Sequence, residues 1–193
     1  MRIHSLLSAL GAAALLSVPS FAFAHPSHAP SGLLSGITHP FSGLDHLLAM
    51  LAVGFWAAQQ KGFARHMVPL TFLLTLLIGG SLGLAGLHLS YLESGIAGSV
   101  IALGLLVAVA AQIRISTALV ITALFGFVHG LAHGLEGPTY SAWSYVIGFM
   151  LATATLHISG YVLVSTLTRG DSLPVRFAGL LSALAGAWLL AFS

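Results

Sequence analysis

Two short stretches of the sequence concentrate side chains that bind divalent metal ions. They hold six such residues: His39, Asp45 and His46 in the first stretch, and His129, His133 and Glu136 in the second. Spacings of four and three residues place the last three on one face of a helix, where they can hold one ion. Imidazole and carboxylate without thiolate suit Ni²⁺, Co²⁺, Zn²⁺ or Cu²⁺ and argue against Cu(I). The two stretches therefore predict a divalent-metal site.

The composition restricts where such a site can lie. Of 193 residues, 58% are hydrophobic and only 5% are charged, whereas an average soluble protein has about 25% charged residues. So few charges cannot cover a water-soluble fold, which excludes a cytosolic enzyme, a nucleic-acid-binding protein and a disordered protein. The net charge of +2 is also too small to attract a polyanion. The low charge therefore predicts an integral membrane protein. Its ten histidines and lack of cysteines make it rich in imidazole and leave it without thiolate ligands.

The amino terminus has the pattern of a secretory signal peptide. A basic start precedes an apolar stretch at Leu6–Val18, and the small residues at 22 and 24 mark a cleavage site. Cleavage after Ala24 makes residues 1–24 the signal peptide and residues 25–40 an extracytoplasmic segment. The alternative is an uncleaved seventh helix, which the short apolar stretch disfavours.

Six further apolar stretches predict the fold class, an all-α integral membrane protein with a six-helix transmembrane domain at residues 41–193. The predicted spans are 41–60, 66–89, 94–113, 115–135, 141–167 and 174–192. The length of each span is close to the roughly 20 residues that a helix needs to cross about 30 Å of hydrocarbon.

The charges predict the orientation of these spans. With the mature amino terminus outside, the breaks that face the cytoplasm hold all the basic residues that remain after cleavage: Lys61, Arg65, Arg114, Arg169 and Arg176. Glu93 and Glu136 fall outside. This is the positive-inside distribution, and it predicts a protein of the bacterial inner membrane with both mature termini in the periplasm.

Small residues recur every three or four residues in three of the predicted spans. They are Gly79 and Gly83, then Gly126, Gly130 and Gly134, and finally Gly179, Ala183 and Gly186. Such stripes let helices approach closely in lipid, so these three spans are expected to pack backbone against backbone.

Depth in the membrane connects the two metal-binding stretches. The apolar run at 47–58 would be only about 18 Å long as a helix, so the first span must begin near Phe41 and draw Asp45 and His46 inside. They would lie about 7 Å, and His129 about 6 Å, outward of the midplane. Ionisable groups at such depth are costly and mark functional sites. The site is therefore predicted to join the first and fourth spans on the outer side.

The sequence supports weaker predictions for the remaining histidines. His39 would lie about 10 Å from His46 along a helix, so it shares their ion only if residues 40–43 are not helical; otherwise it belongs to an entry site. His157, near the middle of the fifth span, is either a second station on an ion path or a hydrogen-bonded helix contact. His25 and His28 are candidates for capturing ions at the mature amino terminus.

The two motifs resemble the signatures of a known family. Residues 39–46 match HPxxGxDH, and residues 129–136 match the later part of FHGx[AV]HGxE, which are the patterns of the HupE/UreJ nickel/cobalt permeases. Val128 replaces the phenylalanine of the second pattern. The resemblance implies a secondary permease rather than an enzyme, with Ni²⁺ or Co²⁺ as transported substrate, no permanently bound cofactor, and a role beside urease or hydrogenase.

The sequence gives no sign of an ATP-driven transporter, and it leaves two alternatives to a permease. The sequence has no Walker motif, and a divalent cation moving inward gains about 4.6 kcal/mol per 100 mV, which is enough for uptake. An intramembrane metal-dependent hydrolase would also need histidines and an aspartate around a metal-bound water. A b-type haem protein would need axial histidines on two helices, but it would not need the accompanying carboxylates.

Overall fold

The computed structural model describes residues 32–138, 141–167 and 172–192, and throughout these ranges the regular structure is helical. The elements are α2 (Leu33–Thr38), the 3-10 turn η1 (His39–Phe41), α3 (Leu44–Gln59), α4 (Ala64–Leu84), α5 (Leu92–Ala108), α6 (Ile115–Glu136), α7 (Ala142–Leu167) and α8 (Leu173–Phe192). The predicted signal peptide, His25, His28 and Arg169 lie outside the described residues.

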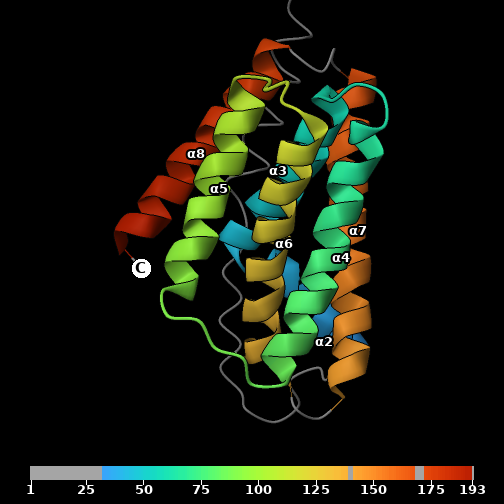
Figure 1. The fold of residues 1–193 in the computed structure, drawn as a ribbon, viewed down its shortest axis with the longest axis vertical. Helices are drawn as coiled ribbons and strands as arrows, with labels where there is room; N and C mark the ends of the chain where they lie inside the picture. The colour runs from blue at the N-terminus through green and yellow to red at the C-terminus, as the bar shows by residue number, and fades with distance from the viewer. Residues whose placement is uncertain (1–31, 139–140, 168–171, 193) are drawn as a thin grey trace, which may run out of the picture.

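The long helices form a bundle with a common axis (Figure 1). Four of them, α4, α6, α7 and α8, are long and apolar enough to cross a membrane. A fifth crossing is possible if α2 with η1 and α3 count as one span, bent by 83°. The helix α5 is apolar but shorter. Large apolar side chains such as Val120, Leu124 and Ile158 are exposed on the outside of the bundle, as expected of a multi-pass membrane protein.

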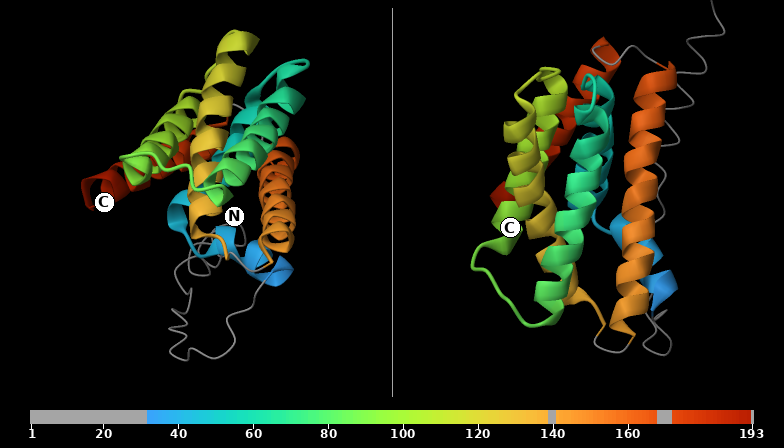
Figure 2. Two further views of the ribbon diagram at one scale, coloured as in Figure 1. Left: turned by 60° about the horizontal axis from the view of Figure 1, so that its bottom comes forward. Right: turned by 45° about the vertical axis from the view of Figure 1, so that its right-hand side comes forward.

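Glycines bring the helices together in pairs. A Cβ on Gly130 of α6 would collide with the Leu76 carbonyl of α4, and one on Gly104 of α5 would lie 2.5 Å from the backbone nitrogen of Ala183 in α8. The pairs α4–α6 and α5–α8 therefore pack backbone against backbone, which confirms the close approach predicted from the stripes of small residues. The helices α3 and α7 form a third such pair, through Gly54 and Gly160 (Figure 2).

Two helices end about five residues earlier than predicted. After α4, Gly86 takes a positive φ of 89°, and the Leu87 amide donates to the Leu82 carbonyl. After α5, Ala110 has a φ of 50° and the Ala111 amide donates to Leu106. Both are Schellman-type ends, in which one left-handed residue stops the helix and satisfies its last carbonyls.

The chain is interrupted at the start of the first predicted span, where the sequence left open whether residues 40–43 are helical. The chain forms α2, turns through η1, and starts α3 only at Leu44. Pro40 provides no amide for a continuous helix, and Gly43 is extended at a φ of −105°. A Cβ on Gly36 would collide with the Tyr145 carbonyl, so α2 lies directly on α7. This contact between α2 and α7 fixes the position of His39, which directly follows α2.

Charges separate to opposite ends of the bundle in the described residues. Lys61 and Arg176 line one cavity of about 560 Å³, and the Arg176 Nε donates to the Ala108 carbonyl at 2.8 Å. Glu93 and Glu136 line another cavity, of about 380 Å³, at the other end. We call these the basic end and the acidic end. Their separation matches the predicted charge distribution.

Candidate metal centre

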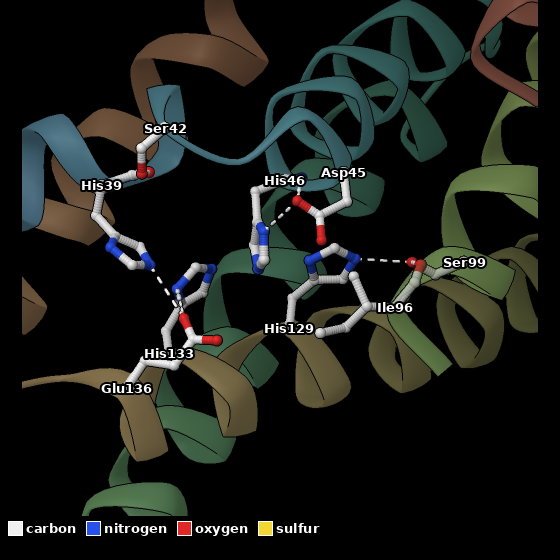
Figure 3. Close-up of polar contacts among 9 residues, drawn as sticks. All are labelled: His39, Ser42, Asp45, His46, Ile96, Ser99, His129, His133 and Glu136. Carbon is white, nitrogen blue, oxygen red and sulfur yellow. Dashed lines mark hydrogen bonds and ion pairs between the residues drawn. The ribbon is translucent and has the colours of Figure 1, made fainter. Parts of the chain in front are cut away.

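Three buried imidazoles from two helices meet inside the bundle, nearer its acidic end (Figure 3). His46 lies in the first turn of α3, and His129 and His133 lie one turn apart on α6. The three residues are 6%, 0% and 2% exposed, and one ligand atom from each falls within 4.8 Å of the others. We call this set the buried triad. It joins the two sequence motifs, which are more than eighty positions apart.

A second group lies toward the surface and shares one residue with the first. His39, His133 and Glu136 also offer ligand atoms within 4.8 Å of one another. The His39 Nε2 lies 3.2 Å from the Glu136 Oε2, and these side chains are 29% and 46% exposed. We call this set the outer triad. His39 lies in the turn η1, and residues 42 and 43 after it are not helical. The stretch at 40–43 is therefore non-helical only in part, and His39 groups with His133 and Glu136 instead of with His46.

The hydrogen bonds of His129 determine which nitrogen is free. Its Nε2 lies 2.7 Å from the Ser99 Oγ, and the same hydroxyl donates to the Ile96 carbonyl at 2.7 Å. Because a serine hydroxyl has one hydrogen, the His129 Nε2–H donates to Ser99. The lone pair is then on Nδ1, which is buried and has no hydrogen-bond partner among the described residues.

Asp45 orients His46 in the same way. The His46 Nδ1 lies 2.7 Å from the Asp45 Oδ1, which also accepts the His46 backbone amide at 2.8 Å. The ring nitrogen therefore donates to the carboxylate, and the lone pair falls on Nε2, again buried without a partner in the described chain. A carboxylate behind a histidine fixes its tautomer and raises its basicity as a ligand. Asp45, expected to be a ligand, is placed behind the buried triad instead of among its ligand atoms.

His133 belongs to both triads. Both of its ring nitrogens are buried without hydrogen-bond partners in the described residues, and its Nδ1 lies 4.0 Å from the Glu136 Oε2. Buried polar atoms are almost always satisfied, so several buried nitrogens without hydrogen-bond partners around one point are the donor set that a cation site would need. A neutral imidazole has one lone pair, so His133 can serve only one triad at a time.

The candidate site has walls whose residues the sequence did not single out. The ring centroid of Phe149 in α7 lies 3.8 Å from that of His133, with the two planes tilted by 46°, and the ring centroid of Tyr145 lies 5.7 Å from that of His39. Phe72 of α4 covers the inner side of His129 at 5.7 Å. These aromatic residues and Ser99 lie in ordinary apolar spans. Their sequence offered no signal beyond hydrophobicity.

His157 lies apart from both triads. It is 3% exposed, and its Nδ1 lies 2.8 Å from the Met50 carbonyl oxygen of α3. Met50 is fully buried in the core. His66 and His88 are exposed and lie near the start of α4 and after its end, respectively.

Comparisons with known proteins identify the family of this chain. The family described as HupE / UreJ protein matches residues 13–189. The curated Protein HupE of Rhizobium leguminosarum bv. viciae is 45% identical over 179 residues, which cover 92% of this chain and 94% of that protein. No solved structure matches. The chain, with both histidine motifs joined at one centre, belongs to the HupE/UreJ family.

Proposed function

We propose that this chain is a secondary permease that takes up Ni²⁺ or Co²⁺ across the bacterial inner membrane. The observation that carries the proposal is the buried triad, in which three imidazole nitrogens face one point inside an apolar helix bundle. Borderline divalent ions prefer such nitrogen ligands. The resemblance of both motifs to nickel/cobalt permeases supports the same substrates, and it supports transport over catalysis.

The orientation follows from the charges. We place the acidic end in the periplasm and the basic end in the cytoplasm, with residues 1–24 removed as a signal peptide and both mature termini outside. Six crossings then require the bent α2–α3 pair and α5 as spans. At about 1.5 Å per residue α5 is about 25 Å long, which a locally thinned bilayer accommodates.

The two triads suggest an order of events for the ion. The outer triad combines a half-exposed carboxylate with two imidazoles, so an ion can bind there while it keeps part of its water. The buried triad offers three nitrogens and little access to water, so the ion loses its remaining shell there. His133 transfers the ion, because its single lone pair must leave the outer triad to complete the buried one.

The membrane potential provides sufficient driving force. A divalent cation moving inward gains about 4.6 kcal/mol per 100 mV. We assign no ATP-dependent step, and we propose that the imported metal supports a urease or hydrogenase. His25 and His28, at the start of the mature chain, would raise the local ion concentration at the acidic end.

Reconstituted proteoliposomes test the proposal. We expect uptake of radioactive Ni²⁺ or Co²⁺ that depends on an inside-negative potential and on no nucleotide. His129→Ala should reduce uptake to the level of empty vesicles, whereas Thr155→Ala, at an exposed position on α7, should not. Absence of potential-driven uptake of both metals by the unmodified protein would refute the permease. Competition between the two ions would identify the preferred one.

A further inference from the structure

A column of aromatic rings runs inward from the outer triad. Successive ring centroids are separated by 4.8, 4.1, 5.0, 5.7 and 5.2 Å in the order His39, His133, His46, His129, Phe72 and His157. Among these six rings, the five imidazoles can ligate a metal and the phenyl ring cannot. Phe72 thus separates the four outer histidines from His157.

The hydrogen bond of His157 leaves one nitrogen free for a ligand. Because a carbonyl oxygen only accepts, the Nδ1–H donates to Met50 at 2.8 Å. The lone pair is therefore on Nε2, which is buried and has no partner in the described part of the chain. One turn earlier on α7, the buried Thr153 hydroxyl also has no hydrogen-bond partner among the described residues. Two buried polar atoms without hydrogen-bond partners on one helix face lower the stability of the fold unless a polar group or an ion binds them.

A cavity continues from His157 toward the basic end. It measures about 210 Å³ and is lined by Arg65, His66, Pro69, His157, Ile158 and Tyr161. Arg65 and His66 lie in the first turn of α4, near the loop that carries Lys61. His66 is exposed, so the cavity lies at the surface. An ion beyond Phe72 would therefore meet His157 first and this opening next.

We propose that His157 is an inner metal station, which receives the ion past Phe72 through its Nε2 and releases it into the cavity beside His66. The proposal rests on the proposed transport of Ni²⁺ or Co²⁺. The station offers one imidazole and a neighbouring hydroxyl, in contrast to the three imidazoles of the buried triad. It therefore holds the ion weakly, which favours release over retention.

A purely structural role of His157 makes a different prediction. The bond to Met50 links α3 to α7 and needs only the Nδ1–H. An asparagine amide can donate in the position of that Nδ1–H but has no ring lone pair. His157→Asn therefore keeps the helix contact and removes the proposed ligand, whereas His157→Ala removes both.

The experiment compares both variants with Thr155→Ala, a control on the exposed side of the same helix. Equilibrium binding of Ni²⁺ and Co²⁺ in detergent reports the triads and the folding of each variant. Uptake at saturating external metal reports passage past His157. We expect both His157 variants to bind within about twofold of the unmodified protein and to transport at least about tenfold more slowly.

Three results would overturn the inner station. Uptake by His157→Asn at the unmodified rate would assign His157 to the helix contact alone. Unchanged uptake by both variants would remove it from the path. A loss of equilibrium binding in His157→Asn would make it a support of the triads. Failure of the unmodified protein to transport either ion would instead refute the permease itself, so the two failures are distinguishable.

Discussion

The outer and buried triads share His133 and each has a second imidazole, but they differ in the third side chain and in what surrounds them. The outer triad has a carboxylate side chain that is 46% exposed, whereas every residue of the buried triad is at most 6% exposed. In the buried triad, hydrogen bonds to Asp45 and Ser99 fix the tautomers of two histidines. The difference teaches that burial and the groups behind the candidate ligands, in addition to the exchange of one imidazole for a carboxylate, would distinguish an entry site from a dehydrating one.

Removal of His133 is expected to have the largest effect, because it takes a ligand from both triads at once. Replacement of residues behind a metal ligand costs about 10- to 100-fold, and loss of a shared ligand should exceed that range. His133→Ala should therefore abolish measurable uptake and reduce Ni²⁺ affinity more than about 100-fold. Isothermal titration of purified protein measures the affinity. If His133→Ala cost no more than Glu136→Gln, the two triads would not share a ligand.

The next largest effect is expected from acidification, which should change the metal affinity of the two triads differently. Imidazole binds metal only when neutral, and its ordinary pKa is about 6.5. Each ligating histidine therefore lowers apparent affinity by up to about tenfold per pH unit below its pKa. Affinity should fall on acidification. Below the pKa of its ligands, the buried triad with three histidines should lose affinity more steeply than a His129→Ala protein that keeps the outer triad. A flat profile would mean that histidines are not the ligands.

The carboxylate behind His46 should have the next effect. Asp45→Asn keeps the size of the side chain but removes the charge that fixes and strengthens His46 as a ligand. We expect Ni²⁺ affinity to fall about 10- to 100-fold, with the protein still inserted and folded. Binding titrations at a fixed pH measure this loss. A loss as complete as that of His133→Ala would show that Asp45 ligates the ion directly.

Ser99→Ala should have the smallest effect of the series. It removes the acceptor of the His129 Nε2–H, and a typical hydrogen bond contributes about 1 kcal/mol. Affinity should therefore fall about fivefold, since 1.4 kcal/mol corresponds to tenfold. Thr155→Ala is the matched hydroxyl control and should change nothing. If Ser99→Ala were neutral as well, His129 would be held by packing alone.

The sequence located both histidine motifs and three helices with surfaces for close approach, but not the partners of those helices or the geometry between the motifs. The spacing of His129 and His133 was sufficient to place both on one face of α6, and the glycine stripes marked faces of α4, α6 and α8 that make close contacts. The break after α2 was left open, because Pro40 and Gly43 are compatible with either a helix start or an interruption. The division into two triads depends on where that break puts His39. Ser99, Phe72 and Tyr145 have no local pattern that relates them to a metal.

The glycine contacts divide the metal-binding region into two mechanical units. The helices α4 and α6 are locked together beside His129 and His133, and α3 is locked to α7, which also carries α2. Each triad takes its candidate ligands from both units: the outer triad combines His39 with His133 and Glu136, and the buried triad combines His46 with His129 and His133. A bound ion would therefore act as a cross-link between two rigid bodies. Metal occupancy should raise resistance to thermal unfolding and restrict rocking of one body against the other, so ion release and relative movement of the two bodies would be coupled.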